Sequence, residues 1–515
     1  MNQILQKLNS LFSGKTRFVY LWLTLGGIGA VFGFAPFFIA PLYGLGIILL
    51  FFALENAPSL KAAFWRAWFF AFIMFAASMF WLGAAFLVDA EKFFWLMPFA
   101  ITLLPAVLAL FWGVGGLVYF KFRPQSATKS LLFAATFTLI EYLRGTLFTG
   151  LPWNLPAYIF NAGGLISQNA AWLGPYGVTL FTIFVFAAIA VIDKKWGKQI
   201  FACMVAVCGI GFAYGFYHKN FTHLVARNNP PIIATGQGGF SQKELYQTGN
   251  ELHVVETYLG LLQSEDAKKS KIIVLPEGTF PFLLLEEPYV LFEINKYIQN
   301  KLLIVGAPRR DFNNEDIYYN SIAFIGGTPK APALLKLYDK GHLVPFGEYL
   351  PFKSVFNALG ITSLVSYGTD FNSGTGPQLI KIADIPLIEP RICYEIIFPN
   401  YTNKESIKAD WIVNVSVDAW YGDLLGPDQH YNQARWRAIE QGKPLIRAAS
   451  GGWSSITDSF GEPVVQFRSG SRLISALLPS KIESTPYSRL GNSIFAAFLL
   501  CFFVAAILID KKAVM

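Results

Sequence analysis

Long apolar segments constrain this chain more than any other feature of its sequence. A helix needs about 20 predominantly apolar residues to cross the hydrocarbon core of a bilayer. Windows approaching that length recur at residues 18–34, 37–54, 65–88, 94–120, 131–148, 178–192, 200–217 and 493–509. One such window would also suit a core helix of a soluble protein, but this many together favour a polytopic α-helical membrane bundle with about eight spans.

The composition agrees with a membrane location. Hydrophobic residues make up 54% of the chain and charged residues only 14%, whereas charged residues are about 25% of a typical soluble domain. The formal net charge of +8 does not indicate nucleic acid, because the basic residues lie beside the apolar windows and form no long basic run. We therefore expect a lipid bilayer, and no nucleic acid, among the partners.

Lysine and arginine are distributed unevenly over the short loops, and such residues favour the cytoplasmic side of a membrane. They lie before the first window (Lys7, Lys15, Arg17), after the second (Lys61, Arg66), after the fourth (Lys121, Arg123, Lys129), after the sixth (Lys194, Lys195, Lys198) and after the last (Lys511, Lys512). Both termini are therefore expected in the cytoplasm. The pattern predicts a membrane domain with seven spans at 1–217, a domain at 218–490 on the opposite side, which is periplasmic in a bacterium, and a final span with a cytoplasmic tail at 491–515.

The long segment between the last two spans has the pattern of an α/β domain. Short β-rich runs bounded by Pro, Gly, Asn or Asp predict strands at 272–275, 302–305, 321–325, 334–337, 385–393 and 411–417. Apolar and long side chains at helical spacing predict a helix over 429–440. A glycine- and serine-rich stretch with apolar insertions, 359–376, is interpreted as a lid.

Three residues of reactive type, Glu277, Lys340 and Cys393, each follow an apolar run in this segment. A cysteine nucleophile needs a base to remove its proton and a cation or hydrogen-bond donors to stabilise the oxyanion. The other cysteines, Cys203, Cys208 and Cys501, lie inside apolar windows. Taken singly, each of the three is a weak signal, since a glutamate after a strand is usually a solvated loop charge and a cysteine in an apolar run is usually a core residue.

The strings around these residues strengthen the signal. The chain resembles the carbon-nitrogen hydrolase (nitrilase) superfamily, whose Glu-Lys-Cys triad occurs in the same order, and more closely the bacterial apolipoprotein N-acyltransferase family. The closer resemblance covers nearly the whole chain. It rests on Tyr338–Tyr349 (YDKGHLVPFGEY), Ile392–Ile396 (ICYEI), Asp418–Gly422 (DAWYG), Glu141–Gly145 (EYLRG) and Thr149–Trp153 (TGLPW).

The resemblance implies roles for individual residues. It makes Glu277 the general base, Lys340 the group that stabilises the tetrahedral intermediate, and Cys393 the nucleophile that carries the acyl group. The supporting residues that it implies are Glu348, Tyr394 and Glu395, and the substrate-binding residues are Arg144, Trp153 and Tyr246. Arg144 and Trp153 have a second interpretation as anchors at the membrane interface. Arg391, where the family has a small or apolar residue, is interpreted as packing at an edge, steadying a phosphate or lowering the thiol pKa.

The resemblance also implies a fold and an activity. The fold is an α-β-β-α nitrilase-like sandwich held on the membrane bundle at the inner membrane, with no metal and no other cofactor. The activity is transfer of a fatty acyl chain from a membrane phospholipid, through a thioester on Cys393, to the α-amino group of the diacylglyceryl-cysteine that begins an apolipoprotein. Two alternatives stay open: a membrane-tethered amidase or nitrilase in which water accepts the acyl group, and a transporter whose polar domain binds a ligand.

Overall fold

The computed structural model describes residues 2–12, 16–351, 353–354 and 370–514, and the chain forms two compact units. The first unit comprises Met1–Thr222, Leu424–Glu440 and Ser484–Met515, and the second comprises His223–Asp423 and Gln441–Glu483. The chain therefore passes through the second unit twice. Each unit is described by itself.

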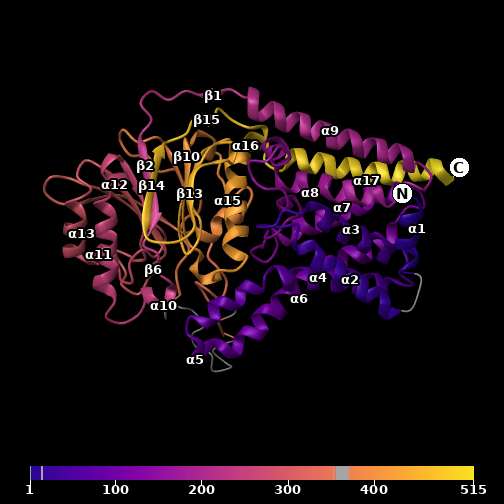
Figure 1. The fold of residues 1–515 in the computed structure, drawn as a ribbon, viewed down its shortest axis with the longest axis horizontal. Helices are drawn as coiled ribbons and strands as arrows, with labels where there is room; N and C mark the ends of the chain where they lie inside the picture. Colours follow the sequence, from indigo (N-terminus) through magenta and orange to yellow (C-terminus); the bar gives the residue numbers. More distant parts are fainter. Residues whose placement is uncertain (1, 13–15, 352, 355–369, 515) are drawn as a thin grey trace. The chain divides into compact units, whose positions relative to one another are not determined.

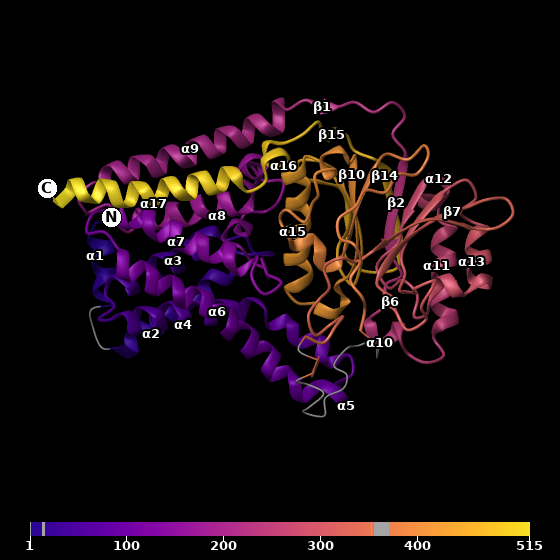
Figure 2. The ribbon, with the colours of Figure 1, turned by 180° about the vertical axis from the view of Figure 1, so that it is seen from behind.

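The first unit is helical. Its α-helices are α1 (Asn2–Ser10), α2 (Thr16–Val31), α3 (Ala40–Glu55), α4 (Leu60–Ser78), α5 (Ala90–Phe93), α6 (Met97–Phe122), α7 (Lys129–Arg144), α8 (Ala170–Ile189), α9 (Gly197–Phe221), α15 (Gly426–Gln441), α16 (Pro486–Leu490) and α17 (Ser493–Val514). The C-terminal helix α17 packs on α8 through aromatic pairs such as Phe181–Phe498 and Phe184–Phe502, whose ring centroids are 5.2 and 5.3 Å apart. Figures 1 and 2 show α17 running alongside α8 and α9.

Five helical segments are long and apolar enough to cross a membrane, judged over the described part of the chain by length and composition: Leu60–Ser78, Ala90–Phe122, Ser167–Ile189, Gly197–Phe221 and Ser493–Asp510. Phe18–Val31 and Ala40–Glu55 are apolar but shorter. The outward side chains of α9 and α17, among them Ile210 and Leu500, are apolar and exposed, as expected of lipid-facing surfaces. The window at 131–148 folds as α7, a 16-residue helix that contains Glu141 and Arg144. The exact count of eight spans stays a prediction.

Helix α15 is polar in sequence yet buried from Gln429 to Gln441. Buried polar groups need hydrogen-bond partners. Many partners of the α15 side chains lie on the 153–162 segment of the first unit. The Gln429 side-chain oxygen accepts from the indole nitrogens of Trp81 (3.1 Å) and Trp153 (2.8 Å). The side chain of Asn432 accepts from the Ala162 amide at 2.9 Å. The helix expected over 429–440 is therefore confirmed, and its polar face belongs to the helical unit.

The second unit contains two main β-sheets. The six-stranded sheet has the order β14-β2-β3-β4-β7-β8, and the five-stranded sheet has the order β13-β12-β11-β10-β9. The strands of the first are β14 (Arg472–Leu477), β2 (Ile232–Gln237), β3 (Ile272–Val274), β4 (Leu302–Gly306), β7 (Ser321–Gly326) and β8 (Ala333–Asp339). Those of the second are β13 (Pro463–Phe467), β12 (Ser454–Thr457), β11 (Leu445–Ser450), β10 (Trp411–Val417) and β9 (Ile388–Ile392). Strands β2, β3 and β4 are mutually parallel, as are β9, β10 and β11.

Alternation along the strands builds two apolar layers in this unit, because successive side chains of a strand point to opposite faces of the sheet. One layer lies between the sheets and includes Ile272, Ile304, Ile392 and Val413. The other joins the opposite face of the six-stranded sheet, for example Ile273, to helices α11 (Glu251–Leu262), α12 (Glu265–Lys269) and α13 (Pro288–Asn295). The predicted strands all occur, within a few residues of their expected bounds. Two facing sheets with helices on the outer face of one of them are the arrangement that the resemblance to nitrilases predicts.

Residues 359–369 of the expected lid lie outside the described residues. The described end of this stretch is tied to the loop after β8, since the Phe371 amide donates to the Glu348 carbonyl and the Gly374 amide to the Lys340 carbonyl, each at 2.8 Å. The lid itself stays a prediction.

Candidate active site

The three residues of the expected triad lie at the ends of three strands in the second unit. Glu277 follows β3, Lys340 directly follows β8, and Cys393 directly follows β9 and opens the short 3₁₀ helix Cys393–Ile397. Because β3 and β9 end near one edge of the sandwich, the fold brings together side chains that are more than 50 positions apart in the sequence. Glu277, Lys340 and Cys393 are all buried.

Lys340 lies between two carboxylates. Its ammonium nitrogen is 2.9 Å from Glu348 and 3.8 Å from Glu277. The Glu348 carboxylate also accepts a hydrogen bond from the Val344 amide at 2.8 Å. This bond closes the loop between residues 344 and 348 and fixes the position of the carboxylate. Burial alone would lower the pKa of Lys340, but the charges of Glu348 and Glu277 outweigh it and raise that pKa above its ordinary value. Lys340 is therefore held as a cation.

Asn320 joins the two glutamates. Its side-chain amide nitrogen donates to Glu277 and to Glu348, each at 2.6 Å, and its backbone carbonyl accepts from the Lys340 amide at 2.8 Å. The Asn320 side-chain oxygen is buried and has no hydrogen-bond partner among the described residues. Sequence reasoning missed this residue, because an asparagine between two strand segments resembles an ordinary turn residue.

Glu277 has the properties of a buried base. One carboxylate oxygen accepts from Asn320, the other accepts from the Val417 amide at 3.0 Å, and the Cys393 thiol lies within hydrogen-bonding reach. Burial raises the pKa of Glu277 above its ordinary value, although the Lys340 ammonium acts in the opposite direction. A carboxylate with a raised pKa is a better proton acceptor than an exposed one.

Cys393 has a strained backbone, with φ at +45°. A residue with a side chain rarely adopts the left-handed region, and such strain clusters at functional sites. Burial and the Glu277 charge raise the pKa of Cys393 to about 12. The resting group is therefore a thiol beside a carboxylate, and not a preformed thiolate.

Glu395 anchors the loops on both sides of the triad. It is completely buried and accepts hydrogen bonds from Tyr338 and Tyr401 hydroxyls and from three backbone amides, of Gly341, His342 and Ile392. Its contacts tie the residue after Lys340 to the residue before Cys393. The neighbouring Tyr394 ring packs edge-on against Phe398 and against His342, with centroids 4.9 and 5.6 Å apart.

A second buried ion pair lies at the end of β10. Arg447 donates to Asp418 at 2.6 Å, and Ser416 donates to the other oxygen of Asp418 at 2.7 Å. The Asp418 charge contributes to the raised pKa of Cys393. Asp418 belongs to one of the motifs that carry the resemblance, but nothing local in the sequence pairs it with an arginine 29 positions later.

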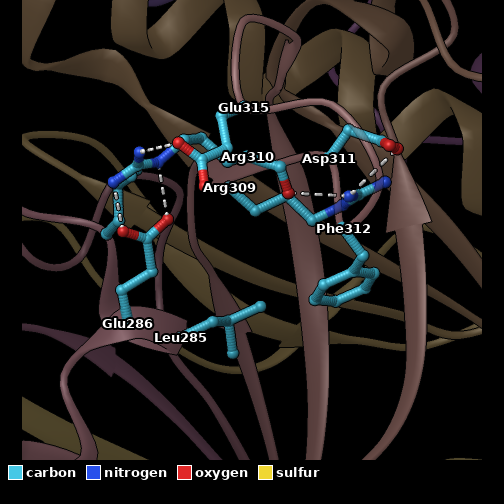
Figure 3. Close-up of a pocket in the computed structure, with 8 residues that line it drawn as sticks. Leu285, Glu286, Arg309, Arg310, Asp311, Phe312 and Glu315 are labelled. Atoms are coloured by element: carbon cyan, nitrogen blue, oxygen red, sulfur yellow. Dashed lines mark hydrogen bonds and ion pairs between the residues drawn. The ribbon is translucent and has the colours of Figure 1, made fainter.

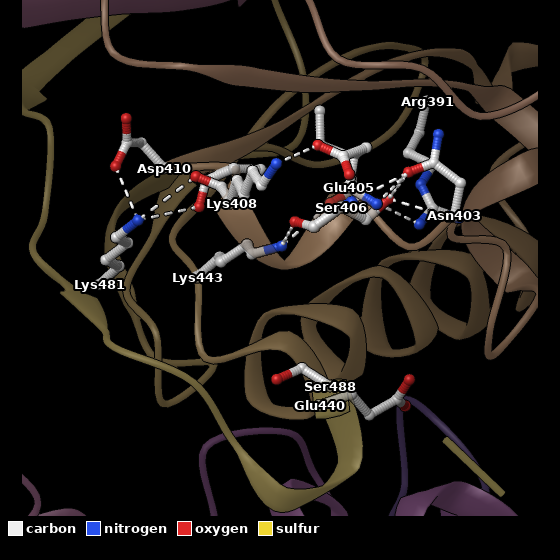
Figure 4. Close-up of polar contacts among 12 residues, drawn as sticks. Arg391, Asn403, Glu405, Ser406, Lys408, Asp410, Glu440, Lys443, Lys481 and Ser488 are labelled. Atoms are coloured by element: carbon white, nitrogen blue, oxygen red, sulfur yellow. Dashed lines mark hydrogen bonds and ion pairs between the residues drawn. The ribbon is translucent and has the colours of Figure 1, made fainter. Parts of the chain in front are cut away.

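Arg391 lies in a separate buried cluster. Its guanidinium pairs with Glu389, which also accepts from Lys443 at 3.2 Å, and it lies over the Tyr401 ring at 5.0 Å. Figure 4 shows Lys443 reaching the Ser406 backbone. Lys443 and Arg391 lower the pKa of Glu389 in spite of its burial. Of the three interpretations of Arg391, packing at an edge fits these contacts, since β9 is the last strand of the five-stranded sheet.

The expected substrate-binding residues are divided between the two units. In the first unit, Arg144 is buried and donates to Glu141 and to the carbonyls of Leu151 and Trp153, and Trp153 is buried against Gln429. In the second unit, Tyr246 is 40% exposed at the end of the short helix Gln242–Leu245. The described residues contain no group of three or more His, Cys, Asp or Glu side chains that could hold a metal ion.

Comparisons with known proteins show the family of this chain. Residues 26–189 match the apolipoprotein N-acyltransferase N-terminal domain, and residues 298–487, which include Lys340 and Cys393, match the carbon-nitrogen hydrolase domain. An apolipoprotein N-acyltransferase of Caulobacter vibrioides is 34% identical over 92% of each chain, and one of Rhizobium rhizogenes is 35% identical over 94% of each. Among solved structures, a nitrilase-superfamily protein of Saccharomyces cerevisiae is 15% identical, covering 50% of this chain and 94% of its own, with a TM-score of 0.37.

Proposed function

Because the chain belongs to the apolipoprotein N-acyltransferase family of membrane acyltransferases, we propose that Cys393 carries the fatty acyl group between a phospholipid donor and an apolipoprotein acceptor. Glu277 is the base, Lys340 stabilises the oxyanion, and Glu348 and Asn320 position both. The observation that carries the proposal is the burial together of a thiol, a carboxylate and an ammonium: the Lys340 ammonium lies 3.8 Å from the Glu277 carboxylate, and the charges of both groups act on the Cys393 thiol.

In the first step, the Cys393 sulfur attacks the ester carbonyl carbon of the phospholipid while the thiol proton moves to Glu277. The ester carbonyl becomes an oxyanion, which the Lys340 ammonium stabilises. The carbon–oxygen ester bond then breaks, and the departing alkoxide takes the proton from Glu277. The products are a lysophospholipid and an acyl thioester on Cys393.

Proton transfer to Glu277 suits a buried site. The thiol, Glu277, Glu348, Lys340 and the neutral ester together carry one net negative charge before the transfer. They carry the same total charge after it, when Glu277 is protonated and the ester carbonyl has become the oxyanion. No charge has to be added to a low-dielectric environment, which would be costly. Lys340 faces the one new centre of negative charge, the oxyanion.

In the second step, the neutral α-amino group of the diacylglyceryl-cysteine attacks the thioester carbonyl. Glu277 accepts a proton from the amine nitrogen, the carbon–sulfur bond breaks, and the proton passes to the departing sulfur. An amide forms and the Cys393 thiol is restored. Donor and acceptor both hold acyl chains whose removal from a bilayer costs about 0.8 kcal/mol per CH₂, which is a reason for an enzyme of this type to be built on membrane helices.

We place the triad on the periplasmic side of the bacterial inner membrane. The alternating basic loops support this topology. They favour a chain with cytoplasmic termini, seven spans before residue 218 and one span after residue 490.

The test is the intact mass of the purified protein after incubation with phospholipid vesicles and no acceptor. We expect the mass of one acyl chain to be added, to disappear with neutral hydroxylamine as a thioester does, and to be absent from Cys393→Ala. Addition of a diacylglyceryl-cysteine peptide should then move the acyl group to the peptide amine. An adduct that persists in Cys393→Ala contradicts the proposal, and release of free fatty acid without peptide acylation identifies a hydrolase instead.

A further inference from the structure

A buried arginine, Arg309, contacts the end of strand β8 just before Lys340, on the side of the strand opposite to the Lys340 side chain. Arg309 belongs to strand β5 (Arg309–Arg310), which pairs with β6 (Tyr318–Tyr319) as a hairpin. Its guanidinium donates twice to Asp339, with Nε at 2.9 Å and Nη2 at 2.7 Å. Asp339 is the residue directly before Lys340.

The Asp339 carboxylate is also held by the Ser321 hydroxyl at 2.6 Å, and Ser321 and Asp339 are register partners on β7 and β8. Their chain neighbours, Asn320 and Lys340, are joined by a backbone hydrogen bond of 2.8 Å. Since successive side chains of a strand point to opposite faces, Arg309, Ser321 and Asp339 form one polar layer. Asn320 and Lys340 project to the other face, where the glutamates lie.

Arg309 is itself well fixed. It is 7% exposed, its Nη1 donates to the Arg310 carbonyl at 3.0 Å, and its guanidinium lies 4.5 Å from the Tyr319 ring centroid. Bidentate arginine–carboxylate pairs combine strength with a defined geometry. The layer therefore joins the β5–β6 hairpin to the backbone that presents Lys340.

The adjacent Arg310 provides a contrast. It points away from Arg309 and forms its bidentate pair with Glu286, at 2.9 and 2.5 Å. Both arginines line a pocket of about 250 Å³, together with Leu285, Phe312 and Glu315 (Figure 3). Arg310 and Glu286 are both partly exposed. Both arginines lie in the same hairpin and pair with a carboxylate. Arg309 is buried and its partner Asp339 precedes Lys340, whereas Arg310 is partly exposed and its partner Glu286 is not next to a triad residue.

We propose that Arg309 is a positioning residue for the acyl transfer, acting through Asp339 to hold Lys340 against Glu277 and Glu348. The inference rests on the proposed function, because it assigns Lys340 to the oxyanion. Misplacement of a positioned group by about 1 Å can cost on the order of 10²-fold in rate. Removal of Arg309 therefore slows the chemical step without weakening the binding of the phospholipid.

The experiment compares Arg309→Leu with Arg310→Leu, its matched control, in single-turnover formation of the Cys393 thioester at varied phospholipid. We expect Arg309→Leu to lower the maximal rate by about 10- to 100-fold with an unchanged half-saturating concentration, Arg309→Lys to recover part of the loss, and Arg310→Leu to match the wild type. The acid limb of the pH profile should move to higher pH in Arg309→Leu, since a displaced Lys340 no longer lowers the pKa of Glu277. The double variant Arg309→Leu/Asp339→Asn should lose no more than Arg309→Leu alone.

Thermal unfolding of each variant separates misfolding from misplacement, and Asp339→Asn, which keeps the shape of the side chain, supplies the same comparison if Arg309→Leu does not fold. Equal losses in the two arginine variants, or a rate for Arg309→Leu within about twofold of the wild type, overturn the inference. Cys393→Ala, assayed beside them, distinguishes the two failures. If Cys393→Ala is inactive and Arg309→Leu is normal, only the positioning role is wrong, whereas an active Cys393→Ala contradicts the function itself.

Discussion

The Lys340 ammonium lies 2.9 Å from the Glu348 carboxylate, and both groups are buried. Lys340 is thus closer to Glu348 than to Glu277, which is 3.8 Å away. Glu348 thereby keeps the cation from neutralising the base, and its own charge contributes to the raised pKa of Glu277. Burial and the Glu348 charge therefore leave Glu277 basic, against the opposing effect of the Lys340 ammonium.

The first prediction concerns Glu348→Gln. Loss of the Glu348 charge leaves Lys340 paired with Glu277 alone, so the pKa of Glu277 falls and its basicity with it. We expect acyl-enzyme formation to slow by about 10²-fold, within the range for general acid–base groups, and the acid limb of the pH profile to move to lower pH. The profile is measured by single-turnover acylation, and a limb that stays in place or moves to higher pH would show that Glu348 does not set the basicity of Glu277.

The second prediction concerns the reactivity of Cys393 in a variant whose other cysteines, Cys203, Cys208 and Cys501, are alanine. With a thiol pKa of about 12, alkylation by a small neutral reagent should be slow at neutral pH and accelerate up to at least pH 10, because the thiolate is the reactive form. Glu277→Gln removes a charge that raises this pKa and should speed alkylation at pH 9, whereas Lys340→Met should slow it. Alkylation that is already at its maximum at pH 7 would contradict the resting thiol.

The third prediction concerns Glu395→Gln. The carboxylate accepts hydrogen bonds from the Tyr338 hydroxyl and from the Gly341 and Ile392 amides. The amide that replaces it turns N–H groups toward some of these donors, so some of them lose their acceptor. Hydrogen bonds to charged groups are worth about 1.5–3 kcal/mol each, so we expect a marked fall in the thermal midpoint together with lost activity. Glu405→Gln, at an exposed ion pair with Lys408, is the control and should melt like the wild type. A Glu395→Gln protein with a normal thermal midpoint would show that Glu395 does not stabilise these loops.

The fourth prediction concerns the polar face of α15. Gln429→Leu removes the acceptor that the indole N–H groups of Trp81 and Trp153 share, together with the hydrogen bond that the Gln429 amide donates to the Ser78 carbonyl. Each hydrogen bond lost costs about 0.5–1.5 kcal/mol. We expect a lower thermal midpoint than for Trp153→Phe, which removes only one of the two donors. Scanning calorimetry of both variants in the same detergent provides the comparison, and the reverse order would contradict it.

The fifth prediction concerns topology. A reporter fused after Met515 should behave as a cytoplasmic protein, and a single cysteine introduced at the exposed Glu315 should react with membrane-impermeant reagents added to the periplasm. The physical reason is the retention of lysine- and arginine-rich loops in the cytoplasm. Periplasmic activity of the C-terminal reporter would contradict this topology, because eight spans that begin in the cytoplasm must also end there.

Local patterns in the sequence were sufficient for the helical membrane character, for the strands β3, β4, β7 and β10, and for the order of Glu277, Lys340 and Cys393. They were sufficient because apolar length and alternation report which side chains are buried, element by element. The resemblance added the family, which the comparisons confirm, and roles for Glu348 and Glu395. Those roles stay proposals, now with contacts that support them.

Only the tertiary structure reveals Asn320 between Glu277 and Glu348, Arg309 behind Asp339, and α15 with its polar face in the helical unit. Each of these depends on hydrogen bonds between residues 28 or more positions apart. Such bonds are decided by strand register and by which segment a helix packs against, and a single asparagine or arginine has no periodicity that would reveal its distant partner. Burial is encoded locally along this chain, whereas the pairing of its buried polar groups exists only once the sheets and helices have assembled.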